Sequence, residues 1–350
     1  MSFFFNGVRS RSVLAGATVH RKRRASRRFL LGALLSVLAV GCKSGDGGQA
    51  ADGKSEGAES KPKFAFVTNN SSDFWNIAEK GLLKAEKDLD VDVEMFRPLK
   101  GEVSDQQRFL EDIQVMGFDG VAISPINPDA MTGVLNKAAE KMPVITHDSD
   151  APKSKRVTYV GTDNVSAGKA AGEAALEALE KAGKKSGKVA LFVGRIDMQN
   201  SIERKKGVEE VLGQVEGLEM LPVFLDNTDR AKAKKNVEDA LVRYPDLVLA
   251  IGLWSYNGPI IAGTVRESAR ADKPVIIAFD EEEEVLRAVK EGLVYATVVQ
   301  KPFEFGYQSV RLLKEANAGE KVPEVYDTGI QTITKENVDP FWAELKELKK

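Results

Sequence analysis

The chain has 350 residues, of which 43% are hydrophobic and 29% are charged. This apolar fraction is ordinary for a globular protein and excludes a wholly disordered chain. Residues 1–28 hold eight basic residues and no acidic one, which leaves 42 basic and 52 acidic residues, a net charge of −10, in the rest. That acidic remainder argues against a nucleic-acid-binding protein, which needs a basic surface.

Cysteine and histidine are too rare for several kinds of site. The single cysteine excludes an intramolecular disulfide framework, and one cysteine with two histidines excludes a thiolate or multi-histidine zinc site. We expect no metal and no cofactor.

The N-terminal 41 residues have the pattern of an export signal. A basic block over residues 21–28 precedes a twelve-residue apolar run at 29–40. The run is too short to cross about 30 Å of hydrocarbon as a helix. A basic region, a short apolar region and then small residues are typical of a secretory signal peptide, so residues 1–41 are predicted to be one. The alternative is a buried core helix.

The sequence Leu-Ala-Val-Gly-Cys at 38–42 resembles the cleavage box of bacterial lipoproteins, although the usual leucine three positions before the cysteine is Ala39 here. The resemblance implies that Cys42 is lipidated and anchors the chain to a membrane in the periplasm or cell envelope. The alternative is a chance cysteine beyond an ordinary cleavage site. Residues 26–31 also resemble a twin-arginine export motif, so that route and general secretion both stay open.

A tether follows the predicted anchor. Residues 43–61 contain no large apolar side chain and are rich in glycine, serine, alanine and charge. Such a segment cannot bury enough surface to offset its ordering entropy. We therefore predict that residues 42–61 form a lipid-anchored flexible tether.

From residue 63 onward, short apolar runs alternate with longer segments of helical period. Strands are expected at 64–68, 91–96, 120–124, 143–147, 189–193, 220–225, 247–253, 275–279 and 296–299. Helices are expected at 74–89, 105–116, 129–141 and 303–316, and between the later strands. Continuously apolar strands separated by helices predict parallel sheets covered on both faces. About ten strands divide more easily into two sheets than one, so we predict an α/β fold of two doubly wound lobes.

Ligands of such sheets bind beyond the carboxyl ends of the strands. The segments there are 69–75, 124–127, 147–150, 194–200, 226–227, 254–257, 280 and 300, and they are rich in Asp, Asn, Gln, Trp and Ser. They contain no phosphate-binding glycine loop and no serine with a histidine base. Carboxylates, amides and flat aromatic rings suit a polyhydroxylated, uncharged ligand.

Simpler interpretations exist for several of these residues. Phe74 and Trp75 could belong to the core at the start of a helix. Asp148 could cap a loop, and Asp280 could cap the helix that follows it. The glutamates at 281–284 are expected to form a solvated first helical turn, favoured by the helix dipole.

Four motifs occur in a characteristic order: Pro-Val-Ile-Thr-His-Asp at 143–148, Gly-Thr-Asp-Asn at 161–164 followed by Gly168 and Gly172, Ala-Phe-Asp at 278–280, and Ala-Thr-Val-Val-Gln-Lys-Pro at 296–302 with Gly306. With them, residues 63 to about 334 resemble the type I periplasmic sugar-binding proteins of ABC transporters, the ribose-binding-like group. The resemblance implies the periplasmic binding protein-like I fold, with two lobes joined by a three-strand hinge. The N-terminal lobe would comprise residues 62–162 and 301–329, and the C-terminal lobe 163–300 and 330–350.

The resemblance also implies the roles of individual residues. Two aromatic rings would stack on the sugar, one carboxylate from each lobe would bind hydroxyl groups, and an arginine and amides would complete the site. The predicted ligand-binding residues are Phe74, Trp75, Ser124, His147, Asp148, Arg204, Trp254, Asn257, Asp280 and Gln300. Ribose binders have arginine where this chain has Ser149, which argues against ribose itself. The large faces of Trp75 and Trp254 would suit a hexose, a pentose or a deoxy sugar.

The function that follows is reversible capture without chemistry. A monomer would bind a monosaccharide, a pentose or hexose, between its lobes and deliver it to an ABC transporter permease in the inner membrane. One alternative is a sugar-sensing input protein for a chemoreceptor or sensor kinase. A repressor would need a helix-turn-helix ahead of the body, and an enzyme could use Asp148 and Asp280 as paired carboxylates.

Overall fold

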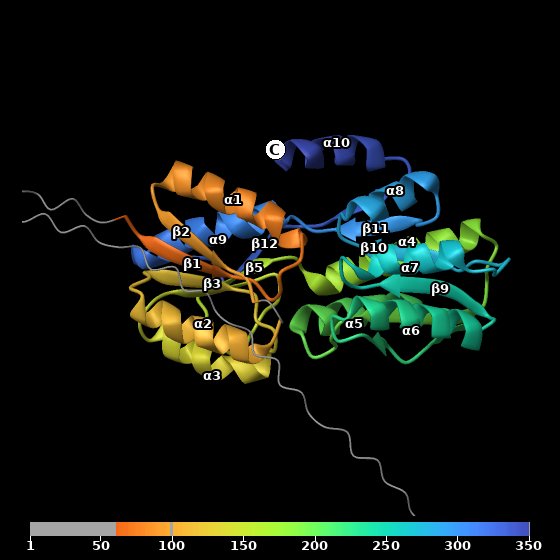
Figure 1. Ribbon diagram of the computed structural model, residues 1–350, viewed down its shortest axis with the longest axis horizontal. Coiled ribbons are helices and arrows are strands. Elements are labelled where there is room, and N and C mark those ends of the chain that lie inside the picture. Colours follow the sequence, from red (N-terminus) through yellow and green to blue (C-terminus); the bar gives the residue numbers. More distant parts are fainter. Residues whose placement is uncertain (1–60, 99–100, 350) are drawn as a thin grey trace, which may run out of the picture. The chain divides into compact units, whose positions relative to one another are not determined.

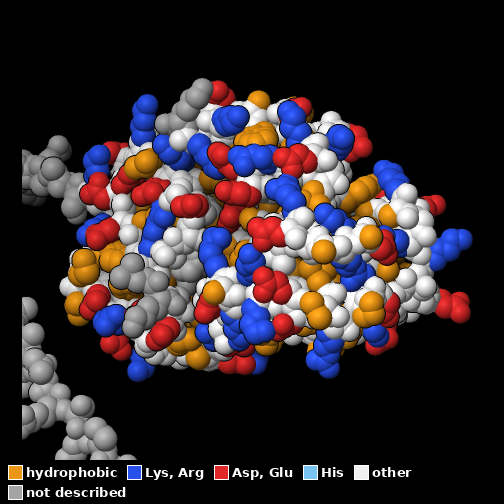
Figure 2. Space-filling model, turned by 45° about the vertical axis from the view of Figure 1, so that its right-hand side comes forward, with side chains coloured by type: hydrophobic (Ala, Val, Ile, Leu, Met, Phe, Trp, Pro, Cys, Tyr) orange, Lys and Arg blue, Asp and Glu red, His pale blue; other side chains and the backbone are white. Residues whose placement is uncertain are grey.

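The computed structural model describes residues 61–98 and 101–349, and this part of the chain forms two α/β lobes (Figure 1). The predicted signal peptide, Cys42 and all but the last residue of the predicted tether lie outside the described residues. Within the described ranges, no helix is both long and apolar enough to cross a bilayer. On the face shown in Figure 2, basic and acidic side chains are interspersed.

The first lobe is built on a six-stranded parallel sheet with the order β12-β5-β4-β3-β1-β2. Its strands are β1 (Lys63–Val67), β2 (Asp92–Phe96), β3 (Gly120–Ile123), β4 (Val144–His147), β5 (Thr158–Gly161) and β12 (Val325–Asp327). The helices are α1 (Phe74–Leu89), α2 (Val103–Val115), α3 (Pro128–Ala139) and α9 (Pro302–Asn317).

Strand β1 shows why the apolar runs are continuous. Phe64 and Phe66 pack with α1 and α9, whereas Ala65 and Val67 pack with α2 and α3 on the opposite face. Alternate side chains of a strand point to opposite faces. Because helices cover both faces, every position of the strand from Phe64 to Val67 is buried.

The second lobe repeats this plan with the strand order β13-β11-β10-β9-β6-β7, and β8 also pairs with β6. Its strands are β6 (Gly187–Val193), β7 (Leu218–Met220), β8 (Phe224–Leu225), β9 (Leu247–Gly252), β10 (Val275–Phe279), β11 (Ala296–Val299) and the antiparallel β13 (Gln331–Thr334). The helices are α4 (Asn164–Lys181), α5 (Gln199–Leu212), α6 (Arg230–Arg243), α7 (Asn257–Glu267), α8 (Glu283–Glu291) and α10 (Val338–Leu348). Helices α4 and α5 share one core and α6, α7, α8 and α10 the other.

The chain passes between the lobes three times, from β5 to α4, from β11 to α9 and from β12 to β13. The predicted fold class, two parallel-sheet lobes joined by three connections, is confirmed. The single strand predicted at 220–225 is wrong: Pro222 separates β7 from β8, because proline has no N–H to donate to a sheet. Strands β5, β12 and β13 had no counterpart among the predicted strands.

Helices α4 and α5 approach each other through two glycines. A Cβ atom on Gly168 would lie 2.2 Å from the carbonyl oxygen of Arg204, and one on Gly207 would lie 2.1 Å from that of Val165. Any side chain at these positions would push the helices apart. The backbone that carries Arg204 is therefore fixed against α4.

We expect Gly168→Ala to destabilise the chain by about 1–3 kcal/mol, because the added methyl group overpacks a backbone contact. Gly263→Ala in α7 is the matched control, since a Cβ there meets nothing within 4 Å. The control should gain about 0.5–1 kcal/mol from helix propensity. Urea unfolding followed by circular dichroism measures both, and equal midpoints for the two variants would contradict the packing argument.

Candidate functional site

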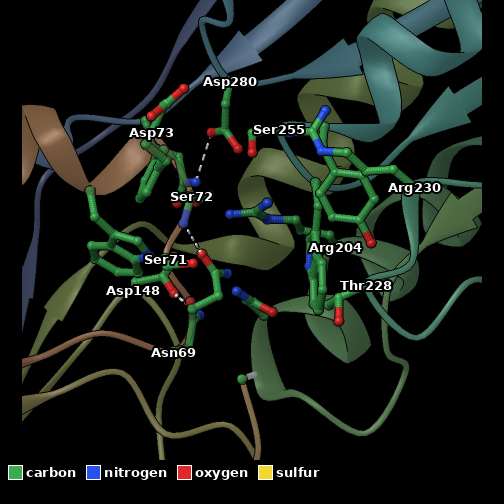
Figure 3. A pocket seen from close by; sticks show the side chains of 18 residues that line it. Asn69, Ser71, Ser72, Asp73, Asp148, Arg204, Thr228, Arg230, Ser255 and Asp280 are labelled. Atoms are coloured by element: carbon green, nitrogen blue, oxygen red, sulfur yellow. Dashed lines mark hydrogen bonds between the residues drawn. The ribbon is translucent and has the colours of Figure 1, made fainter. Parts of the chain in front are cut away.

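A cavity of about 360 Å³ lies between the carboxyl ends of the two sheets (Figure 3). Both lobes contribute to its wall. The first lobe supplies Asn69, Asn70, Ser71, Ser72, Asp73, Phe74, Trp75, Gly101 and Asp148, and the second supplies Asn200, Arg204, Thr228, Arg230, Trp254, Ser255, Tyr256, Asp280 and Gln300. A second cavity, of about 480 Å³, adjoins it and holds fewer of the predicted residues.

Two aspartates enter the cavity from opposite lobes at equivalent places. Asp148 directly follows β4, and Asp280 directly follows β10. Both have left-handed backbone conformations, with φ of 57° and 67°. Such conformations are uncommon outside glycine and concentrate at functional sites. The shared geometry turns each carboxylate toward the interlobe cavity.

The carboxylate of Asp148 is held by two neighbours. Ser124 donates from Oγ to Oδ2 at 2.7 Å, and Asn69 donates from Nδ2 to the same oxygen at 3.0 Å. Burial raises the pKa of Asp148 to about 6, although Arg204 and the Ser124 hydroxyl oppose the rise. The group is 4% exposed. A carboxylate in this environment has spare acceptor capacity and little access to water.

Asp280 has an equivalent arrangement in the second lobe. Gln300 donates from Nε2 to Oδ1 at 2.9 Å, and the Thr297 hydroxyl donates to the Asp280 carbonyl at 2.7 Å. Burial raises the pKa of Asp280, and Arg204 opposes the rise. The helix that follows is capped at Glu282 and begins at Glu283, so Asp280 is not the N-cap.

Arg204 connects the two halves of the site. Its side chain is buried, with Nε donating to Asn164 Oδ1 at 3.0 Å and Nη1 donating to the Leu253 carbonyl at 2.7 Å. The guanidinium lies 4.6 Å from the centre of the Phe279 ring. Figure 3 shows it reaching into the cavity between the two aspartates. Nη2 has no hydrogen-bond partner, so one cationic donor is left for a ligand.

Further polar atoms at the cavity wall also lack partners. Asn69 Oδ1 and Gln300 Oε1 are unpaired acceptors, and Trp75 Nε1 and Trp254 Nε1 are unpaired donors. Buried polar groups in folded proteins are normally hydrogen-bonded. Unpaired donors and acceptors from both lobes around one cavity therefore indicate a surface that a polar ligand completes.

The structure brings seven of the ten predicted ligand-binding residues to the cavity wall: Phe74, Trp75, Asp148, Arg204, Trp254, Asp280 and Gln300. Trp75 is also a core residue, 1% exposed and edge-on to Phe66 at 6.2 Å between ring centres. Trp75 is therefore both a core residue and part of the cavity wall.

Three predicted residues do not line the cavity. Ser124 donates its hydroxyl to Asp148, and Oδ1 of Asn257 accepts from the backbone N–H of Trp254 at 3.2 Å. His147 is fully buried and stacks on Phe66 at 4.0 Å between ring centres. Burial lowers the pKa of His147 to about 3, so the ring is neutral. The structure places it in the core beneath the site.

The cavity also contains residues that strand-end reasoning missed. Thr228 and Arg230 follow β8, where Asn227 and Thr228 both have positive φ, of 57° and 64°. Asp226 holds this turn by accepting from the Thr228 N–H at 2.8 Å and from the Tyr256 hydroxyl at 2.5 Å. In the sequence, the only signal for Thr228 and Arg230 was the polar run at 226–230, which follows the apolar residues at 220–225.

The raised pKa of Asp148 predicts a pH-dependent stability. The folded chain binds this proton more tightly than the unfolded chain, so the stability of the ligand-free protein falls as pH rises from about 4 to about 6. Asp148→Asn removes this term and keeps a residue that tolerates left-handed backbone. At neutral pH the variant should be more stable by up to about 3 kcal/mol, and the gain should vanish below the ordinary pKa of aspartate.

Urea unfolding at a series of pH values measures this difference. Asp90→Asn is the control, because Asp90 has φ of 52° but an exposed carboxylate. Parallel stability curves for the wild type and Asp148→Asn would show that Asp148 titrates normally.

Comparison with known proteins agrees with this geometry. A family model described as a periplasmic binding protein domain matches residues 64–321. The ribose import binding protein of Salmonella typhimurium is 27% identical over 230 residues, which are 65% of this chain and 75% of that protein. An ABC transporter solute-binding protein from Burkholderia graminis, solved in complex with D-arabinose, is 28% identical with a TM-score of 0.75 and covers 79% of this chain and 96% of its own.

A glucose-galactose binding protein from Geobacillus stearothermophilus is 31% identical with a TM-score of 0.74, and the match covers 80% of this chain and 99% of that one. The residues matched by the family model include all those that line the cavity and the strands of both sheets except β12 and β13. The chain therefore belongs to the periplasmic binding protein domain family.

Proposed function

We propose that this chain is an extracytoplasmic solute-binding lipoprotein that captures a monosaccharide, a pentose or hexose, between its lobes. The observation that carries the proposal is the meeting of Asp148 and Asp280, one from each lobe, around the unpaired Nη2 of Arg204. The captured sugar would pass unchanged to an ABC transporter permease.

The donors and acceptors of the cavity match the hydroxyl groups of a sugar. A hydroxyl can donate to the carboxylate of Asp148 or Asp280 and accept from Arg204 Nη2 at the same time. Bonds to charged groups are about twice as strong as bonds between neutral groups. Asn69 Oδ1 and Gln300 Oε1 supply further acceptors. A charged ligand would instead leave one of the buried acids or the arginine opposed by like charge.

The aromatic residues complete the match. Phe74 and Trp75 from the first lobe and Trp254 from the second all line the cavity. Their flat faces can cover the apolar C–H face of a sugar ring, which gains from leaving water. The relatives named for ribose, D-arabinose and glucose-galactose binding support a sugar of this size.

Capture would be coupled to movement of the lobes. We take the lobes as residues 62–162 with 301–329 and residues 163–300 with 330–350, joined by the three connections. A ligand bound by Asp148 and Asp280 together touches both lobes only when they are close, so it shifts the population toward the closed form. Release to a permease then requires that the lobes reopen.

Isothermal titration with D-ribose, D-arabinose, D-allose, D-glucose and D-galactose tests the proposal. We expect at least one sugar to bind, and Asp148→Asn and Asp280→Asn each to weaken it by about 10- to 100-fold through loss of a charged acceptor. Asp90→Asn, outside the cavity, should leave the affinity unchanged. Absence of binding by the whole panel, or full affinity in both cavity variants, would refute the sugar site.

The N-terminal sequence carries the second part of the proposal, anchoring at the periplasmic or cell-envelope side of a membrane. Cys42 directly follows a predicted leader with a basic block and a short apolar run, and it begins a glycine- and serine-rich tether. Acyl chains on Cys42 would add about 0.8 kcal/mol of membrane affinity per buried CH₂ group.

In a bacterial host, the mature chain should carry acyl mass at Cys42 and sediment with membranes. Cys42→Ala should abolish both properties, while the sugar affinity of the folded body stays the same. Mass spectrometry of the mature N-terminus makes the measurement. An unmodified cysteine in the wild-type chain would refute the anchor.

A further inference from the structure

A hydrogen bond outside the cavity joins the two lobes. Asn127, at the start of α3 in the first lobe, donates from Nδ2 to Oδ2 of Asp197 in the second lobe at 3.0 Å. Neither residue lines the cavity, and neither lies in the three connections between the lobes. The contact therefore joins the lobes where neither the hinge nor the cavity wall holds them.

Asn127 is oriented for this contact by its own helix. Its Oδ1 accepts from the Ala130 N–H at 2.8 Å and caps the first turn of α3. With the amide oxygen fixed in this way, the amide nitrogen faces away from the helix. The amide oxygen of Asn127 thus caps α3 in the first lobe, and its amide nitrogen bonds to Asp197 in the second lobe.

Asp197 is oriented by Arg195. Arg195 donates from Nε to Oδ1 at 3.0 Å and from Nη2 to Oδ2 at 2.8 Å. This two-pronged pair lowers the pKa of Asp197 and keeps the carboxylate charged. Both partners are therefore positioned before they meet, so little side-chain entropy is lost when the contact forms.

We propose that Asn127 and Asp197 form a latch that stabilises the closed arrangement of the lobes. A contact that exists only when the lobes are close favours that arrangement in the free protein and in the complex. If the cavity binds sugar as proposed above, the latch raises the affinity without touching the ligand, because the ligand selects the closed form. Asn127 and Asp197 are then positioning residues for capture.

The two ends of Asn127 can be separated by substitution. Asn127→Asp keeps the oxygen that caps α3 but replaces the donor with a carboxylate oxygen that faces Asp197. Aspartate caps helices as well as asparagine does, so the urea midpoint should not fall. Combining Asn127→Asp with Asp197→Asn removes the second carboxylate and gives the pair one amide donor again, although that amide nitrogen gives up the bond that Arg195 Nη2 makes to Oδ2 of Asp197.

The experiment measures the dissociation constant and the dissociation rate for the sugars of the panel above, by calorimetry and stopped-flow fluorescence. We expect Asn127→Asp to raise the dissociation constant and the dissociation rate by about fivefold, the size of one net hydrogen bond, and the double variant to recover part of the loss, because the two like charges no longer face each other. Asp129→Asn is the matched control, since Asp129 lies in the same helical turn but pairs with Lys153 inside the first lobe. Wild-type constants in Asn127→Asp, or no recovery in the double variant, would overturn the latch.

Small-angle scattering of the ligand-free chain gives a readout that does not depend on the sugar. Asn127→Asp should have a larger radius of gyration than the wild type, and the double variant should return toward the wild-type value. If no sugar binds but this pattern appears, the proposed function fails and the latch stands. If sugar binds but neither the constants nor the radius change in Asn127→Asp, the latch fails alone.

Discussion

The site depends on one buried cation placed between two buried acids. Taking Arg204, Asp148 and Asp280 out of water raises the pKa of both carboxyl groups, and the guanidinium limits that rise. Charges in such surroundings are costly unless their hydrogen bonds are complete. Here the hydrogen bonding of the site is incomplete, because Nη2 of Arg204 and the side-chain oxygens of Asn69 and Gln300 have no partner. The cavity is a polar network whose unpaired donors and acceptors a polar ligand would complete.

The backbone, more than the side chains, sets this arrangement. Asp148 and Asp280 take the same left-handed conformation at equivalent strand ends of the two sheets. Arg204 stands on a helix that is fixed against α4 by the absence of side chains at Gly168 and Gly207. The positions of Asp148, Asp280 and Arg204 therefore follow from three backbone features: the ends of β4 and β10, the left-handed residues there, and the close contact between α4 and α5.

The fold class and much of the cavity wall could be predicted from the sequence. Buried parallel strands appear there as continuous apolar runs, and the polar residues at their carboxyl ends directly follow these runs. The pattern located β10 and β11 at their true bounds and directed attention to Asp148, Asp280 and Gln300. It failed where position depends on tertiary packing. His147 follows the same polar pattern but faces Phe66 in the core, and the turn before Arg230 uses two left-handed residues that are not glycine. Very short strands such as β12 give too few residues for a periodic signal.

The order of elements along the chain also has a consequence for how the protein is made. The first sheet receives its last strand, β12, only after the whole second sheet except β13 has been synthesised, and α9 arrives just before it. Until α9 and β12 have been made, the face of the first sheet that α1 shares with α9 is only partly covered, and the edge of β5 is unpaired. The first lobe can therefore be completed only after nearly all of the second lobe has been synthesised.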